Sequence, residues 1–335
     1  MTWREQRIVT ILTTIVLILA AALLIVLGIR FREWRDSGNS DAGSTAAGIV
    51  TDSGEYTALT YSNGSATLSF TRDDAGVWHW TADEAFPLDD MVIRQILDLL
   101  ANWTPQQTLT EEAALDGSGL DESTASLTAT TADGKTTSVL FGKTTTDGNS
   151  HYVRLNGDLS TVYIIAGTLY ELMSTPIYDM CRLPELPVLA ETSMRSITIQ
   201  GAAGEDGTEG PVTVLTAAAA DGVVSWRSSG ANVTDDPTVR SLLEDLTAPK
   251  VAKCVDYNPS EEAVEICGLN APEATVDIAY TTESGTDGEL SFSVGARLPD
   301  KSGRYVQLNG ESTIYLMETD MLDPLMRVAA DGLEG

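Results

Sequence analysis

The sequence predicts an α+β fold of two tandem homologous modules, each an antiparallel β-sheet with one main helix packed on it, preceded by a single N-terminal transmembrane helix. Three observations support this: a long apolar run near the N-terminus, a six-residue phrase that occurs twice, and alternating apolar residues around Asn-Gly and Asp-Gly turns. A chain of 335 residues is also long enough for two domains with cores of their own.

The N-terminal apolar run extends from Ile8 to Ile29, 22 residues without a charge. As a helix it would measure about 33 Å, which matches a bilayer hydrocarbon core of about 30 Å. It is apolar on every side, unlike an amphipathic helix of a soluble core. It also exceeds the apolar stretch of a cleaved signal peptide. We therefore expect residues 1–35 to be a tail and anchor that crosses the lipid bilayer at 8–29.

The charges beside this run leave its orientation open. Arg4 and Arg7 precede it, whereas Arg30, Arg32 and Arg35 follow it, and the positive-inside rule alone would place the body inside. A very short N-terminal tail and a Thr/Ser-rich body poor in lysine and cysteine favour the opposite. We expect a single-pass cell-membrane protein with a cytoplasmic N-terminus and an extracytoplasmic body.

The body is strongly acidic. The whole chain has a net charge of −29, although residues 1–35 carry five arginines against two glutamates. Such a charge excludes binding to nucleic-acid phosphates and keeps the body soluble. The alternative, a weak surface for divalent cations or a cationic partner, remains open.

Internal duplication follows a small, polar tether at residues 36–48. The phrase YVRLNG at 152–157 returns as YVQLNG at 305–310, and LDDMVIRQILDLL at 88–100 returns as TDDPTVRSLLEDL at 234–246 with a constant separation of 146 residues. The order of matching motifs does not change along the chain. This indicates two copies of one unit.

These matches predict a first module at 49–187, a second at 188–327 and a tail at 328–335. Within a module, Asn-Gly and Asp-Gly pairs between alternating residues predict β-hairpins. The paired aspartates precede apolar residues at helical spacing, which predicts a helix of about three turns. We expect the polar insertion at 202–211 to be a surface loop.

No pattern in the chain predicts a catalytic, cofactor or metal site. The two histidines, His79 and His151, have no histidine counterpart in the other copy, and no metal-ligand, nucleophile-elbow or phosphate-loop motif is present. The duplicated pairs Asp89/Asp90 and Asp235/Asp236 are the best carboxylate candidates. Helix capping explains them fully, with Arg94 and Arg240 as local partners. We expect the protein not to be an enzyme.

A possible binding surface is predicted from residues that the two copies do not share. Trp80 and Trp226 are equivalent and are expected in the core, whereas Trp78 and Trp103 have no clear counterpart and are expected to be exposed, as a sugar-stacking platform would require. Arg154 in the first copy corresponds to Gln307 in the second, and Arg304 in the second copy corresponds to His151 in the first. These four residues, Trp78, Trp103, Arg154 and Arg304, form the candidate surface.

Three cysteines, Cys181, Cys254 and Cys267, do not define a disulfide framework. Cys254 and Cys267 are close enough in sequence to bridge in an oxidising compartment. We expect all three to be buried thiols, and the sequence leaves their redox state open.

The anchor, the strand-G-x-W hairpin, the D-D-x-x-[IV]-R-x-[IL]-L helix, the G-L turn and the Y-V-R-L-N-G hairpin together resemble the bacterial domain-of-unknown-function family 4340. The resemblance covers residues 48–185, and residues 194–326 more loosely. It implies a single-pass membrane protein with external domains and an auxiliary role beside gliding-motility-type ABC transporter components. It supplies no catalytic residues.

The expected function is therefore that of a non-enzymatic, extracytoplasmic accessory subunit of an ABC-type transport complex. A cell-envelope glycan- or ligand-binding module is the alternative, and an envelope hydrolase is a third possibility. The sequence does not identify the partner or the cargo.

Overall fold

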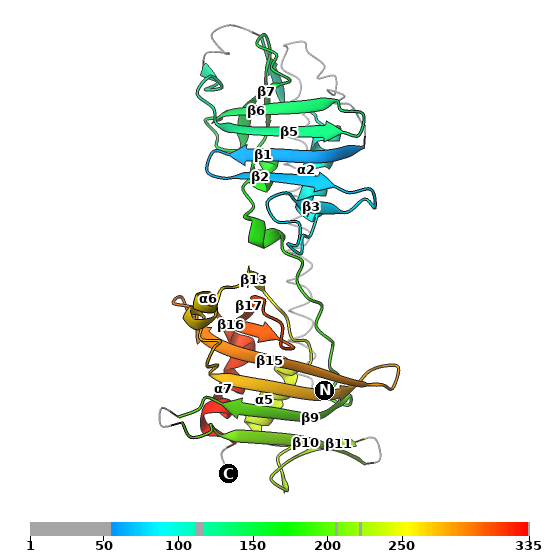
Figure 1. Cartoon of the computed structure of the whole chain (residues 1–335), viewed down its shortest axis with the longest axis vertical. Coiled ribbons are helices and arrows are strands. Elements are labelled where there is room, and N and C mark those ends of the chain that lie inside the picture. Colours follow the sequence, from blue (N-terminus) through cyan, green and yellow to red (C-terminus); the bar gives the residue numbers. More distant parts are fainter. Residues whose placement is uncertain (1–54, 111–116, 205–206, 221–222, 334–335) are drawn as a thin grey trace, which may run out of the picture. The chain divides into compact units, whose positions relative to one another are not determined.

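The computed structural model describes residues 55–110, 117–204, 207–220 and 223–333 (Figure 1). The expected tail, anchor and tether at 1–48 lie outside these residues. Within the described ranges, no helix is both long enough and apolar enough to cross a membrane.

The first module is built on an eight-stranded antiparallel sheet (Figure 1). Its strands lie in the order β3-β2-β1-β5-β6-β7-β8-β4. Their bounds are β1 Tyr56–Asn63, β2 Thr67–Arg72, β3 Trp78–Trp80, β4 Gln107–Leu109, β5 Ala125–Thr131, β6 Thr136–Thr144, β7 Ser150–Leu155 and β8 Val162–Ala166.

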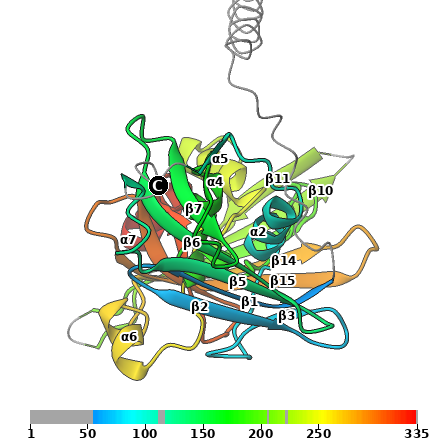
Figure 2. The same cartoon turned by 90° about the horizontal axis from the view of Figure 1, so that it is seen from above.

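Helices cover one face of this sheet. The main helix α2, Met91–Ala101, lies beside strands β1, β2 and β5 in Figure 2, and it contacts the closing helix α4, Thr168–Met173. Ile93, Ile96 and Leu100 recur at helical spacing on the buried face of α2. They belong to the same apolar core as Leu59 and Leu127, which are fully buried on the strands. A 3₁₀ helix η1, Ile177–Met180, ends the module.

The second module repeats this architecture with a nine-stranded sheet ordered β12-β11-β10-β9-β14-β15-β16-β17-β13. Apart from the additional edge strand β12, each strand occupies the place of its equivalent in the first sheet. The bounds are β9 Met194–Gly201, β10 Val212–Ala220, β11 Val223–Ser228, β12 Ala231–Asn232, β13 Lys253–Asp256, β14 Ala274–Thr281, β15 Asp287–Arg297, β16 Gly303–Leu308 and β17 Ile314–Glu318. The α+β class and the two antiparallel modules are thus confirmed.

Three helices belong to the second module: α5 Pro237–Leu246, α6 Glu261–Ile266 and α7 Thr319–Asp331. Helix α7 contacts both α5 and β9. It continues beyond residue 327, where the sequence predicted a tail, because Val328 and Ala329 on the same face are buried in the core. The described residues of the 202–211 insertion are mostly exposed, as expected of a surface loop.

The repeated Asn-Gly phrase forms the same hairpin turn in both modules. Asn156 and Gly157 have φ of 50° and 73°, and Asn309 and Gly310 have φ of 49° and 74°. Positive φ at both central residues is the type I′ arrangement that matches the twist of paired strands. Each asparagine also accepts a hydrogen bond from the strand beyond the hairpin, Ser138 N–H at 2.8 Å and Ser291 N–H at 3.0 Å. The asparagine therefore joins a third strand to the turn.

A loop ending in the Gly-Leu pair packs closely against a strand glycine in each module. The amide of Lys143 donates to the carbonyl of Ser118, and the amide of Ala296 donates to the carbonyl of Cys267, both at 2.8 Å. A Cβ added at Gly142 or Gly295 would overlap the same carbonyl oxygen. In the second module this loop closes a small apolar cluster of Cys267, Leu269 and Ile314.

Candidate functional site

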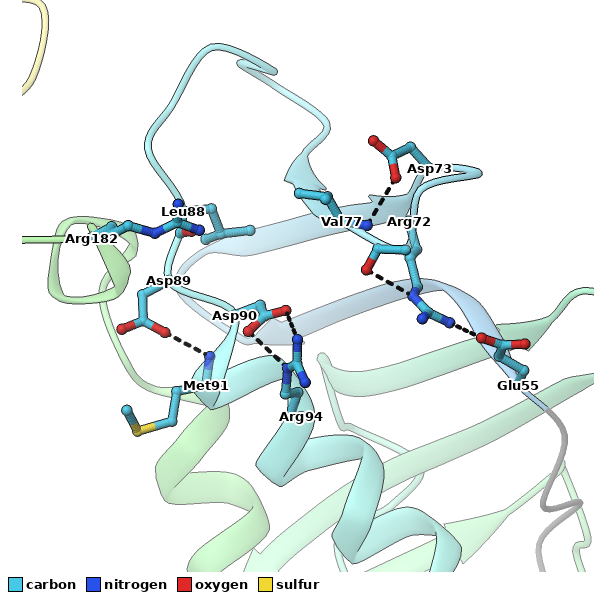
Figure 3. A network of polar contacts seen from close by, with 11 residues as sticks. Glu55, Arg72, Asp73, Val77, Leu88, Asp89, Asp90, Met91, Arg94 and Arg182 are labelled. Carbon is cyan, nitrogen blue, oxygen red and sulfur yellow. Dashed lines mark hydrogen bonds and ion pairs between the residues drawn. The ribbon is translucent and has the colours of Figure 1, made fainter.

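The duplicated aspartates begin the main helix of the first module, and their carboxylates are fully used there. Figure 3 shows Asp89 accepting a hydrogen bond from the Met91 amide at 3.0 Å and Asp90 forming two 2.8 Å hydrogen bonds with the guanidinium of Arg94. Asp90 raises the pKa of Arg94 above its ordinary value through these bonds. Both carboxylates thus make hydrogen bonds or an ion pair to groups in the first turn of the helix, which is a structural role.

The second module uses the same residues with their roles exchanged. Asp236 caps helix α5 by accepting from the amides of Thr238 and Val239 at 2.7 and 3.2 Å, while Asp235 pairs with Arg240 at 2.5 Å. Pro237 explains the exchange, because it occupies the first helical position and has no amide proton to offer. Asp236 thus caps α5 as the sequence indicated, whereas the side chain of Asp90, at the N-cap of α2, accepts no capping bond and is held by its ion pair with Arg94.

The two tryptophans that were expected at the surface are buried. Trp78 is 5% exposed and Trp103 is 6% exposed, and the ring of Trp103 packs against Tyr163 at 6.5 Å. The lack of an equivalent residue in the other copy was a poor guide to exposure. Burial of a large aromatic ring is favourable whether or not the other module has the same residue. Trp78 and Trp103 do not form a flat sugar-stacking platform.

Arg154 and Arg304 also lie in separate, mostly buried places. Their side chains are 11% and 13% exposed, and they pair with Asp121 at 3.6 Å and Glu273 at 2.6 Å respectively. Each has a buried Nε without a hydrogen-bond partner among the described residues. Because their charges are already matched, these arginines do not present a cationic surface, and the structure does not bring the four candidate residues together.

A different site emerges from the architecture, because each module has a cleft at the same place. In the first module it lies where the C-terminal end of α2 meets the junction of β8 and α4, lined by Leu99, Asn102, Trp103, Thr104, Ile165, Ala166, Thr168 and Leu169. In the second it lies where α5 meets the junction of β17 and α7, lined by Glu244, Asp245, Ala248, Lys250, Val251, Ala252, Glu318 and Met321. We call these the first cleft and the second cleft.

The separations in sequence confirm that the clefts are equivalent. Leu99 and Asp245 are 146 residues apart, the separation of the duplicated aspartates. Ala166 and Glu318 are 152 residues apart, which is also the separation of Val162 and Ile314, the equivalent first residues of β8 and β17. Both sides of the cleft therefore derive from the duplicated unit.

The first cleft has an apolar floor and one unused polar group. Its volume is about 200 Å³, and Leu99, Ile165 and Leu169 supply much of its lining. The indole Nε1 of Trp103 is buried and has no hydrogen-bond partner among the described residues. An unpaired buried donor of this kind costs about 1–3 kcal/mol.

The second cleft is larger and acidic. Its volume is about 410 Å³, and Glu244, Asp245 and Glu318 contribute carboxylates beside a single lysine, Lys250. Burial raises the pKa of Asp245, and the neighbouring charges of Glu244 and Asp320 raise it further. Carboxylates that repel one another in this way favour a positively charged occupant.

The described residues contain no group of three histidine, cysteine or acidic side chains arranged to hold a metal ion. The two histidines are in unrelated places: His79 pairs with Asp73 at 3.0 Å on the surface, and His151 stacks on Tyr170 at 4.4 Å.

The two antiparallel sheets have the same strand order apart from one additional edge strand, and each module has a cleft at the equivalent helix end. The chain belongs to the DUF4340 family of domains of unknown function, whose family model matches residues 78–205 and 226–331. Neither the curated proteins nor the solved structures contain a match to it.

Of the four predicted binding-surface residues only Trp103 lines a cleft, and the other cleft residues were missed although a signal was present. At equivalent positions of the two copies, Leu99 becomes Asp245 and Ala166 becomes Glu318, so a change from apolar to acidic occurs twice. Only the fold shows that these two positions line the same cleft, because they lie far apart along the chain.

Proposed function

We propose that this protein is a non-enzymatic accessory subunit of an ABC-type transport complex in the membrane. Residues 8–29 anchor it in the bilayer, and its two modules lie outside, where their clefts bind other subunits or the cargo. The resemblance to the family implies an association with gliding-motility-type transporters, and this supports the choice of complex.

The pair of equivalent clefts with different linings is the observation that carries this proposal. A duplicated catalytic site would need the same reactive groups in both copies, whereas Leu99 and Asp245 have different chemistry at equivalent positions. Different linings suit two different binding surfaces. The first cleft accepts an apolar group, and the second accepts a basic group.

Site-specific crosslinking in intact cells tests this proposal. A photoreactive amino acid replaces Leu99 in one variant and Asp245 in another, and both positions line clefts. Leu159 is the control, because it is 72% exposed and lies at the turn between β7 and β8, away from both clefts. We expect each cleft position to crosslink to a component of the transport complex.

The outcome against the proposal is equally specific. If Leu99 and Asp245 capture no membrane-complex component, or capture the same proteins as Leu159, the clefts are not its docking sites. A topology reporter fused after Gly335 tests the location separately, since an extracytoplasmic body requires activity of an exported reporter and not of a cytoplasmic one.

The glycan-binding alternative loses its main support, because Trp78 and Trp103 are buried. A hydrolase would require an activated nucleophile or an acid-base pair, and the aspartate pairs are fully engaged in capping and ion pairs. We therefore extend the proposal to neither function.

A further inference from the structure

Two cysteines that are far apart in sequence meet where the two modules join. Cys181 follows η1 at the end of the first module and is 5% exposed, and Cys254 lies in β13 of the second module and is fully buried. Residues 48–335 form one compact unit, so this contact lies within a single body.

The neighbouring side chains hold these two segments against each other. The Lys253 ammonium pairs with the Asp179 carboxylate at 2.6 Å, and the Tyr178 hydroxyl donates to the Asp256 carboxylate at 3.5 Å. Both contacts join a residue within three positions of Cys181 to a residue within two positions of Cys254. These two contacts thus hold the segment that contains Cys181 against the segment that contains Cys254.

The two thiols interact with each other. This interaction lowers the pKa of the Cys181 thiol and raises the pKa of the Cys254 thiol, which burial raises further. Cys181 is therefore the more readily ionised of the two thiols, and its Sγ donates a 3.7 Å hydrogen bond to the carbonyl of Arg182 while it is protonated. A lowered thiol pKa is what makes a cysteine a nucleophile in thiol–disulfide exchange.

The third cysteine has neither feature. Cys267 belongs to the small cluster with Leu269 and Ile314, and burial raises the pKa of its thiol. Proximity in sequence allowed a Cys254–Cys267 bridge, whereas the fold places Cys254 near Cys181. All three are buried free thiols in this structure, as the sequence predicted.

We propose that Cys181 and Cys254 form a disulfide bond that covalently links the two modules when the body is in an oxidising compartment. The oxidant is a disulfide, either on a thiol–disulfide oxidoreductase or on a small molecule such as oxidised glutathione. This inference goes beyond the proposed function, from which it takes only the extracytoplasmic location.

The reaction is two successive exchange steps. The Cys181 thiolate attacks the oxidant disulfide, which forms a mixed disulfide and releases one oxidant thiol. The Cys254 sulfur then attacks the sulfur of Cys181, and the second oxidant thiol leaves. Two cysteine thiols are oxidised, one disulfide is reduced to two thiols, and those thiols take up the two protons.

The test uses the full chain purified in mild detergent and incubated with oxidised glutathione. Afterwards the chain is denatured without reductant, the remaining thiols are alkylated and counted, and the linked peptides are mapped. We expect one remaining thiol, Cys267, and a linked peptide pair that contains Cys181 and Cys254. Cys181→Ser and Cys254→Ser should abolish the link, and Cys267→Ser, which removes another buried thiol, should keep it.

A second readout detects the link between modules directly. A protease site inserted at Val188, which is exposed in the segment joining the two sheets, is cut after oxidation. The halves should then migrate as one species without reductant and as two with it. A parallel sample treated with dibromobimane, a short reagent that joins two adjacent thiols, controls for poor reactivity with glutathione.

Three alkylated thiols together with no bimane crosslink would overturn the proposal, because the sulfurs would then not be adjacent in solution. A link from Cys254 to Cys267 would overturn it as well. Loss of transporter crosslinks from the clefts would leave this result unchanged, so failure of the proposed function is distinguishable from failure of the disulfide.

Discussion

Gly295 should be one of the least replaceable residues of the second module. It lies in β15, and the loop that ends in Gly268 and Leu269 crosses it so closely that a Cβ would overlap the carbonyl oxygen of Cys267. The same Cβ would lie 3.0 Å from the Leu269 side chain. Gly295→Ala therefore forces this loop away from the strand.

The magnitude follows from what the displacement breaks. Moving the loop costs the hydrogen bond from the Ala296 amide to Cys267, worth about 1 kcal/mol. Overpacking against Leu269 and the small cluster behind it costs about 1–3 kcal/mol more. We expect Gly295→Ala to lower the free energy of unfolding by about 2–4 kcal/mol.

Urea unfolding of the full chain in mild detergent, followed by tryptophan fluorescence, measures this loss. Gly142→Ala is the equivalent change in the first module, where the carbonyl of Ser118 takes the place of Cys267, and it should cost a similar amount. Gly117→Ala is the matched control, because a Cβ there meets nothing within 4 Å. If Gly295→Ala is no more destabilising than Gly117→Ala, the close approach is not what requires glycine.

Three further outcomes are expected. In an NMR titration the pKa values of the two histidines should depart from 6.5 in opposite directions. Hydrogen bonding to Asp73 raises the pKa of His79, so the contribution of His79 to stability is lost as pH rises through that raised pKa. Burial lowers the pKa of His151, so stability falls as pH drops below 6.5. Asp245→Asn should raise the melting temperature at neutral pH, because the raised pKa of Asp245 means that its ionisation opposes folding; the gain should disappear in melts below pH 3.8, where the carboxyl is protonated in both states. Trp226→Phe should cost about 2 kcal/mol in urea unfolding, because Trp226 is fully buried and its indole N–H donates to Glu191.

The duplicated phrases predicted the repeated unit, its hairpins and its main helix because these depend on local chemistry. Asn-Gly dictates a turn through its backbone preferences, and aspartate is a residue that the N-cap position favours, as at Asp90 and Asp236. The short edge strands β4 and β13 were not predicted. Three or four residues carry too little alternation, and they become strands only by pairing with β8 and β17.

The candidate site could not be predicted in the same way. Each cleft joins the end of one helix to a strand–helix junction more than sixty residues further along, such as Leu99 and Ile165. That proximity comes from the strand order, which places β4 beside β8, and no local pattern encodes it. Residue type alone also misplaced Trp78, since the same ring serves a core or a sugar platform depending on the face to which the strand turns it.

The two copies differ in their clefts while they agree in their framework. The Asn-Gly hairpin, the glycine beneath the Gly-Leu loop and the aspartate–arginine helix start are present in both modules, so the fold requires them twice. The cleft linings have no such requirement, and they have changed from apolar at Leu99 to acidic at Asp245. Two like clefts would suit two copies of one partner segment. An apolar cleft and an acidic cleft on one chain instead suit one partner, or two subunits, that offer one apolar and one basic contact. A disulfide between Cys181 and Cys254 would fix the spacing between those two contacts.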